Sequence, residues 1–92
     1  MAYVLSRHKV EDYARWKQVF DEFIDMRRKN GELSHQIFHI EGDPNNIEAL
    51  FRWNTLENAR KFLNSKELQT AMQKGGVAEP PEVTFLDCIE NC

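Results

Sequence analysis

Histidine spacing is the first place to look for chemistry in this 92-residue chain. His35 and His39 are four residues apart, a spacing that suits a metal site on a helix. The residues between them, Gln-Ile-Phe, instead favour a strand, on which four residues span about 13 Å. Two imidazoles that far apart cannot share one ion. We therefore expect no metal site, since His8 would have to complete one by chance of folding.

His39 is the candidate general base, because histidine has an ordinary pKa near neutral pH. Its strand is otherwise apolar, with Ile37 and Phe38 just before it. A lone histidine in such a place is more often a partly buried structural group with a hydrogen-bond partner. If His39 faces the helices, we expect it to contact their aromatic side chains, and both interpretations stay open here.

A second set of residues has the type that lines a pocket for an aromatic ligand. It consists of Trp16, Phe20, Phe23, Phe51 and Trp53. Aromatic side chains also supply much of the burial in a small domain, so most of this set is expected to belong to the core. The two tryptophans each carry an N–H that needs a partner, which favours positions at the rim of a pocket.

Other signatures of catalysis are missing from the sequence, which has no glycine-rich phosphate loop, no Gly-x-Ser-x-Gly and no Cys-x-x-Cys. Asp21 and Asp25 lie one helical turn apart among basic residues, which is typical of a solvated face with ion pairs. Cys88 has no basic neighbour that would activate a thiolate. Together with Cys92 it makes no disulfide framework, so a reducing cytosol is expected.

Hydrophobic periodicity predicts the elements that position these residues. An apolar stripe at helical spacing runs from Asp12 to Asn30, where Gly31 ends it. A second helix follows the cap Thr55, bends at Asn64-Ser65 and ends at Gly75-Gly76. The expected strands cover residues 2–8, 35–41, 47–53 and 83–89, with residues 42–46 as the turn between the middle two.

The resulting order, β-α-β-β-α-β, predicts an α+β fold of the ferredoxin-like type in a single domain, residues 1–92. Both helices then cover one face of a four-stranded antiparallel sheet. The last three strands carry apolar residues on both faces, so the uncovered face needs a partner. A second copy of the same sheet is the simplest partner, which predicts a homodimer.

Composition argues against several classes of function. A net charge of −3 and a pI of about 5.6 disfavour binding to nucleic acid or to anionic membranes. No apolar run reaches the roughly 18 residues that span a membrane. The first residues lack a signal-peptide pattern, so a cytoplasmic protein is expected.

RNA recognition is a minor alternative, because RNA-recognition modules share this order of elements and stack bases on strand aromatics. Tyr3, Phe51 and Trp53 could imitate those aromatics. The strand over residues 47–53, however, lacks the glycine and the basic character of the corresponding RNA-binding motif.

Over nearly its whole length the chain resembles the antibiotic biosynthesis monooxygenase-like group of the dimeric α+β barrel superfamily. The resemblance is carried by His8-Lys-Val-Glu-Asp-Tyr-Ala-Arg-Trp-Lys17, Phe20-Asp21, Asp43-Pro44-Asn45, Leu50-Phe51-Arg52-Trp53, Ala59-Arg60-Lys61-Phe62, Ser65-Lys66-Glu67-Leu68 and Gly76-Val77. It implies a dimeric barrel with a pocket between helices and sheet, and oxygenation of polycyclic phenols or quinols without a cofactor. A dimer that binds a ligand without turnover, or has a purely structural role, is the alternative.

The resemblance extends to a haem-degrading branch, which relies on a Trp and a His in the second helical region. Laying the Leu-Asn-Ser stretch of that branch on Leu63-Asn64-Ser65 puts Phe62 at the Trp position and Met72 at the His position. Haem breakdown is therefore not expected. Phe62 and Met72 are expected to join the aromatic residues that line the ligand pocket.

Overall fold

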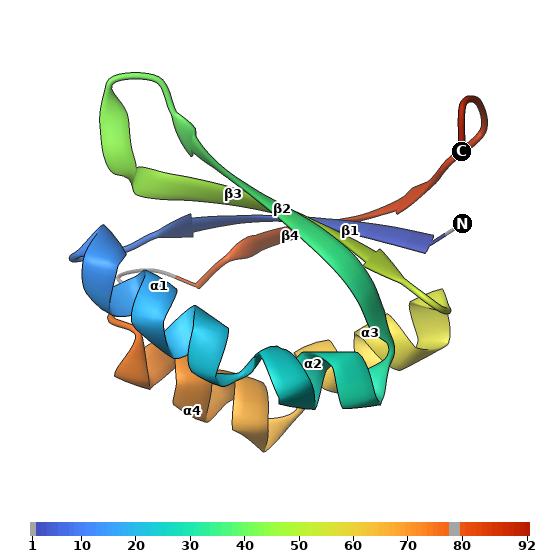
Figure 1. Ribbon diagram of the computed structural model, residues 1–92, viewed down its shortest axis with the longest axis horizontal. Helices are drawn as coiled ribbons and strands as arrows, with labels where there is room; N and C mark the ends of the chain where they lie inside the picture. Colours follow the sequence, from blue (N-terminus) through green and yellow to red (C-terminus); the bar gives the residue numbers. More distant parts are fainter. Residues whose placement is uncertain (1, 78–79) are drawn as a thin grey trace.

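The computed structural model describes residues 2–77 and 80–92 as one sheet with a layer of helices on one side (Figure 1). The elements are β1 (Ala2–Lys9), α1 (Tyr13–Glu22), α2 (Ile24–Asn30), β2 (Glu32–Ile40), β3 (Asp43–Trp53), α3 (Leu56–Leu63), α4 (Lys66–Lys74) and β4 (Glu82–Asp87). All four strands pair antiparallel in the order β2-β3-β1-β4. The predicted ferredoxin-like α+β fold is confirmed.

Strand register decides which side chains face the helices. Val4 on β1 lies opposite Phe51 on β3 and Phe85 on β4, so these three side chains share a face. Val4, Ser6 and the other even-numbered residues of β1 therefore point toward the helical layer. The odd-numbered residues of that strand point to the open face.

Each predicted helix is divided in two. The bend at Asn64-Ser65 is confirmed, because the Leu68 N–H donates to Ser65 Oγ (3.2 Å) and begins α4 there. The first helix also breaks, at Phe23, whose backbone leaves the helical region with φ −97° and ψ 10°. The prediction of one continuous helix from Asp12 to Asn30 was therefore wrong. No glycine or proline in the sequence marks this break. Asp12 does cap α1, accepting the Ala14 N–H at 3.0 Å.

The hairpin between β2 and β3 is longer and tighter than predicted. Pairing already begins at Ile40 and Asp43, so the turn consists of Glu41 and Gly42 rather than residues 42–46. Gly42 has a positive φ of 80°, which a two-residue hairpin turn requires. Strand β2 also starts earlier than predicted, at Glu32, and β4 ends earlier, at Asp87.

The apolar core consists of two clusters between the sheet and the helices. One comprises Ala2, Val4, Trp53, Ala59 and Phe62. The other comprises Val10, Trp16, Phe20 and Ile47. Members of both clusters line the pocket described below, so the pocket interrupts the core rather than lying outside it.

The open face of the sheet is also partly apolar, as predicted. Register places Tyr3, Leu5, Leu50 and Leu86 together on this face. Phe38 lies on the same face beside β3 and is 51% exposed. Nothing within the described residues covers these side chains as a layer, because the helices all lie on the other side (Figure 1).

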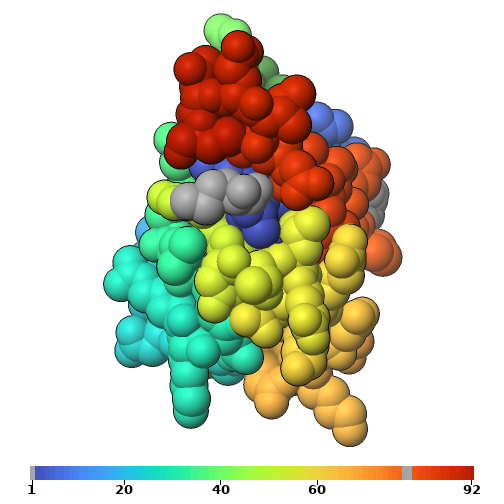
Figure 2. All heavy atoms as spheres, turned by 90° about the vertical axis from the view of Figure 1, so that its right-hand side faces the viewer, coloured from blue at the N-terminus to red at the C-terminus, as the bar shows by residue number. Residues whose placement is uncertain are grey.

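Cys88 and Cys92 form a disulfide, with Cα atoms 5.9 Å apart, which corrects the expectation of reduced thiols. The bridge closes a short loop within the C-terminal segment and joins no two helices or strands. Figure 2 shows this segment gathered at one end of the molecule, apart from the helices α2 and α3. Among the described residues, no helix is long and apolar enough to cross a bilayer.

Candidate functional site

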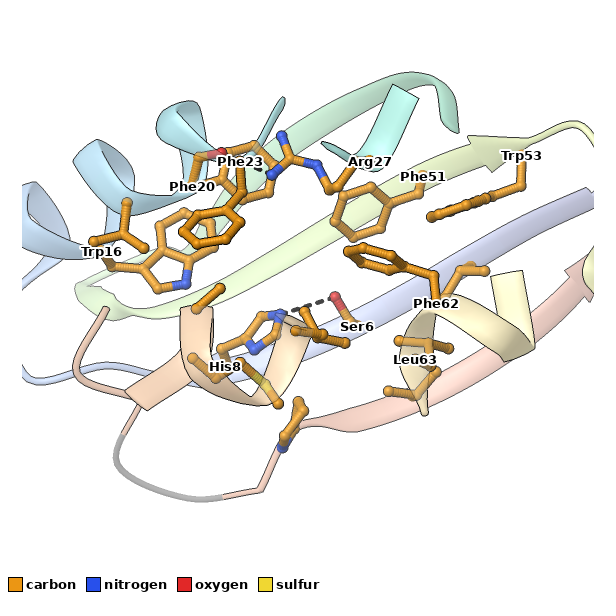
Figure 3. A pocket seen from close by; sticks show the side chains of 17 residues that line it. Ser6, His8, Trp16, Phe20, Phe23, Arg27, Phe51, Trp53, Phe62 and Leu63 are labelled. Carbon is orange, nitrogen blue, oxygen red and sulfur yellow. Dashed lines mark hydrogen bonds between the residues drawn. The ribbon is translucent and has the colours of Figure 1, made fainter. Parts of the chain in front are cut away.

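A cavity of about 80 Å³ lies between the sheet and the helices (Figure 3). Its lining includes all seven residues that the sequence marked for a ligand pocket: Trp16, Phe20, Phe23, Phe51, Trp53, Phe62 and Met72. The structure therefore brings together side chains from α1, α3, α4, β3 and the break between α1 and α2. Whether a ligand occupies this space stays a prediction.

The aromatic lining is both core and pocket wall. Trp16 and Phe20 stack with ring centroids 4.9 Å apart, and each is less than a tenth exposed. Trp53 and Phe62 form a second pair at 5.4 Å. One side of each ring is packed in the core and another borders the cavity, so the two interpretations of these residues do not exclude one another.

The polar part of the wall is a Ser–His pair on β1 that sequence reasoning missed. Ser6 and His8 are two residues apart on the strand, so both point toward the helices. Ser6 Oγ lies 3.0 Å from His8 Nε2, within hydrogen-bond distance, and Figure 3 shows the pair beneath the aromatic side chains. The alternation of side chains along the strand could have predicted the pair, because Ser6 and His8 lie on the same face as Val4.

Burial controls the charge of this pair. Desolvation lowers the pKa of His8 to about 4, so the imidazole is neutral at pH 7. His8 Nδ1 is buried and has no hydrogen-bond partner among the described residues. A neutral imidazole has a lone pair to offer a ligand, but a pKa this low makes it a weak base.

Arg27 is the charged residue of the lining, and two of its three side-chain nitrogens are paired. Its Nε donates to Glu32 Oε1 at 2.9 Å and its Nη1 donates to the Phe20 carbonyl at 2.7 Å. The guanidinium also lies 3.7 Å from the centroid of the Phe20 ring. Burial lowers the pKa of Arg27, and the Glu32 carboxylate opposes that shift. The two buried charges balance, but Arg27 Nη2 is buried without a hydrogen-bond partner among the described residues, so an N–H donor remains at this end of the pocket.

His39 does not reach the pocket. It lies opposite Ile47 on the helix side of the sheet, but near the β2–β3 turn, which extends beyond the helical layer (Figure 1). Its side chain is exposed, and Nδ1 lies 3.0 Å from the Ile40 carbonyl oxygen. The predicted contact with the Trp16–Phe20–Phe23 stripe is therefore wrong, because the β2–β3 hairpin curls away from the helical layer (Figure 1). The histidine that meets Trp16 is His8, at 5.9 Å between ring centroids.

His35 belongs to the structural network behind the pocket. Its Nδ1 lies 3.3 Å from Glu32 Oε2, and its ring meets Phe20 edge-on at 5.0 Å. No cluster of three or more His, Cys, Asp or Glu side chains suited to a metal occurs in residues 2–77 and 80–92.

The strand aromatics do not form a surface for stacking RNA bases. Phe51 and Trp53 face the helices, and Trp53 is only 3% exposed. Tyr3 alone of the proposed set lies on the open face. The arrangement that suggested an RNA-recognition module is therefore absent from the described strands.

No protein-family model matches the chain, and no curated protein matches it in sequence. Solved structures do match. SnoaB of Streptomyces nogalater, a cofactor-independent oxygenase, has a TM-score of 0.79 at 13% identity, covering 98% of this chain and 94% of SnoaB. A Bordetella bronchiseptica protein provisionally described as an antibiotic biosynthesis monooxygenase has a TM-score of 0.80 at 17% identity, with 96% of each chain covered.

Rv0793 of Mycobacterium tuberculosis gives a TM-score of 0.72 at 16% identity, covering 98% of this chain and 96% of that one. These alignments span nearly the whole of each chain. At such low sequence identity they establish a common fold and nothing more. The chain therefore has the fold of the antibiotic biosynthesis monooxygenase-like proteins.

Proposed function

We propose that this chain binds an aromatic small molecule in the cavity between helices and sheet, and oxidises it as a cofactor-independent monooxygenase. The observation that carries the proposal is the cavity itself, which has aromatic walls and one hydrogen-bonded Ser–His pair. Such a site is typical of small-molecule recognition. The likeness in fold to SnoaB, a cofactor-independent oxygenase, supports the reaction class.

In this proposal His8 takes the place that the sequence gave to His39. In a reaction without a cofactor the substrate supplies both electrons: one atom of O2 enters the ring, and the other leaves as water with the hydrogens of the hydroxyl group and of the attacked carbon, so that a phenol becomes a quinone. The substrate must be electron-rich to react with O2, and weakening the bond to its hydroxyl proton makes it so. His8 is neutral at pH 7 and lies in the pocket wall. In the tautomer whose Nε2–H donates to Ser6 Oγ, the unpartnered Nδ1 keeps a lone pair that can accept a hydrogen bond from a ligand. Its low pKa suits holding a proton donor better than removing the proton outright.

The same low pKa favours a second candidate function, binding without turnover. A pocket whose histidine is a weak base can hold an aromatic molecule firmly without activating it. The lining residues would be unchanged, and only the fate of the ligand would differ. Both candidate functions require a ligand to bind in the cavity, and they differ in whether oxygen is then consumed. One experiment that measures both binding and oxygen uptake therefore separates them.

We further propose that the protein is a homodimer, joined through the open faces of two sheets. The supporting observation is the group of apolar side chains on that face. A cytoplasmic location stays a prediction.

The test combines binding with oxygen uptake. The protein's two tryptophans, Trp16 and Trp53, both line the cavity, so their indole N–H resonances report occupancy. Titration with 2-naphthol should shift both resonances, and an oxygen electrode should record protein-dependent uptake that falls in the His8→Phe variant. Binding without uptake would select the non-catalytic candidate. An absence of binding by 2-naphthol, smaller phenols and unsubstituted rings alike would contradict both.

A further inference from the structure

We infer that Arg27 is the subsite for a carbonyl oxygen, so that the natural occupant of the cavity is a neutral molecule with a carbonyl group. This inference rests on the proposed binding function and narrows it, because it names the group that the ligand presents to α2. It is drawn from the burial of the guanidinium, its incomplete pairing and the charge balance around it.

The guanidinium of Arg27 is paired at two nitrogens and unpaired at the third. Its Nε donates to Glu32 Oε1 at 2.9 Å and its Nη1 donates to the Phe20 carbonyl at 2.7 Å. Its Nη2 is buried, and no described residue accepts a hydrogen bond from it. Arg27 as a whole is only 4% exposed, so bulk water does not reach this nitrogen freely.

The second oxygen of the Glu32 carboxylate has another partner. An arginine often binds a carboxylate through two parallel hydrogen bonds, one to each oxygen. Here Glu32 Oε2 instead lies 3.3 Å from His35 Nδ1. The Nη2 N–H groups of Arg27 are therefore left for an acceptor that the described residues do not supply.

The cavity is the space from which such an acceptor can come. Arg27 belongs to its lining, where the guanidinium lies 3.7 Å from the centroid of the Phe20 ring (Figure 3). A buried donor without a partner is costly, and more so when it is charged. A ligand that packs against the aromatic wall and turns an oxygen toward Arg27 would remove that cost.

Charge balance favours a carbonyl oxygen over a carboxylate. The fully buried side chain of Glu32 already offsets the charge of Arg27, and His8 is neutral at pH 7. A carboxylate would add a second buried negative charge, whereas a carbonyl oxygen accepts the N–H without changing the net charge. A carbonyl oxygen also brings no proton of its own, which would need a further acceptor among the surrounding rings.

The test compares acetophenone with α-methylstyrene, which has a similar shape but a CH2 group in place of the carbonyl oxygen. Binding is followed through the indole N–H resonances of Trp16 and Trp53, which both line the cavity. The double variant Arg27→Met/Glu32→Gln removes both charges together, so that neither is left buried alone. It should weaken acetophenone binding about tenfold to hundredfold, the range of a hydrogen bond to a charged group, and leave α-methylstyrene binding unchanged.

The double variant Arg7→Met/Glu48→Gln is the matched control, because it makes the same substitutions in an ion pair outside the lining. It should change the binding of neither probe. In the wild-type protein, benzoate, which offers a charged acceptor on the same ring, should bind more weakly than acetophenone.

A second measurement needs no variant and serves if Arg27→Met/Glu32→Gln does not fold. Acetophenone labelled with carbon-13 at the carbonyl is bound to the wild-type protein, and the resonance of that carbon is recorded. A hydrogen bond from the guanidinium should place it at, or downfield of, its position in water. A position like that in cyclohexane would show that the oxygen meets no donor.

The contrary results separate this inference from the proposed function. The carbonyl subsite is overturned if the Arg27→Met/Glu32→Gln variant keeps its affinity for acetophenone, or loses affinity for both probes equally. Tighter binding of benzoate than of acetophenone would overturn the neutral carbonyl in favour of an anion. Failure of both probes while 2-naphthol binds would overturn the inference and leave the proposed binding function standing. Failure of all of these compounds would overturn both.

Discussion

At the scale of single residues, the site depends on His8 and on the buried Arg27–Glu32 pair. Both lie where the sheet meets the helices, and both are costly to place there. His8 leaves a buried ring nitrogen unpaired among the described residues, and Arg27 takes a full charge out of water. A protein retains such buried polar groups when an ion pair or a function of the site offsets the free energy lost on desolvation. Removing them should therefore change stability or ligand binding measurably.

The pKa of His8 predicts how stability depends on pH. Folding lowers this pKa from 6.5 to about 4, so between these values the unfolded chain binds a proton that the folded chain does not. Stability is therefore full above about pH 6.5 and is lost as the pH falls toward 4, by up to about 3 kcal/mol. Urea denaturation at pH 7 and pH 4.5 measures this loss, which the His8→Phe variant should largely abolish.

The exposed His39 offers the matched control for that experiment. His39→Phe should keep the pH dependence of the wild type, because this imidazole lies outside the pocket. A His8→Phe variant with an undiminished loss of stability would show that another group is responsible.

The buried ion pair predicts a large difference between two similar substitutions. Glu32→Gln leaves the Arg27 guanidinium buried without its counter-charge and should cost about 3–5 kcal/mol. Glu48→Gln removes the partner of Arg7 in a pair that is 27% and 46% exposed, and should cost less than about 1 kcal/mol. Equal effects in urea denaturation would mean that Glu32 and Arg27 do not act as a buried pair.

Much of the pocket lining could be predicted from residue type alone, because large aromatic side chains on a 3.6-residue stripe must point inward. Polar members of the lining could not. Ser6 and His8 are common surface residues, and only the register of β1 against β3 shows that they share a face with Val4. His39 was favoured because histidine has an ordinary pKa near neutral pH. Its exposure follows from the β2–β3 hairpin, which curls away from the helices (Figure 1), and the strand sequence does not encode that curl.

At the scale of the elements, the pocket exists because four short helices, rather than two long ones, cover the sheet. The break at Phe23 places that residue in the lining, and α4 covers the cavity without burying any of its own residues. Ser65 made the second break predictable through its capping hydroxyl. The first break has no such signal, because Phe23 ends one helix and begins the next without a side-chain cap.

Gly31, between α2 and β2, gives a prediction about this helical layer. It has a φ of 127°, and a Cβ added there would clash with Asn54 Oδ1. Gly31→Ala should therefore destabilise the protein by about 1–3 kcal/mol. Gly42→Ala is the matched control, because Gly42 also has a positive φ but has no atom within 4 Å of the added group. Thermal unfolding should show the larger loss for Gly31, and a larger loss at Gly42 would contradict the crowding against Asn54.

At the scale of the whole molecule, the apolar residues of the open face predict a dimer. Sedimentation equilibrium at micromolar concentration should give twice the 10.9 kDa mass of one chain. Leu50→Lys puts a charge among Leu5 and its neighbours on that face and should give the single-chain mass. Gln69→Lys, on the exposed side of α4, should remain dimeric. A single-chain mass for the wild type across this range would contradict the pairing of sheets.

The central claim is that the cavity between helices and sheet holds an aromatic ligand, and a crystal structure with 4-bromophenol tests it most directly. This probe has one ring, one hydroxyl and a bromine atom whose anomalous scattering marks its position. The account predicts a bromine peak inside the cavity, with the ring beside Trp16 and Phe20 and the hydroxyl oxygen within hydrogen-bond distance of the Ser6–His8 pair. An empty cavity at saturating probe, or bromine only on the open face of the sheet, would contradict it.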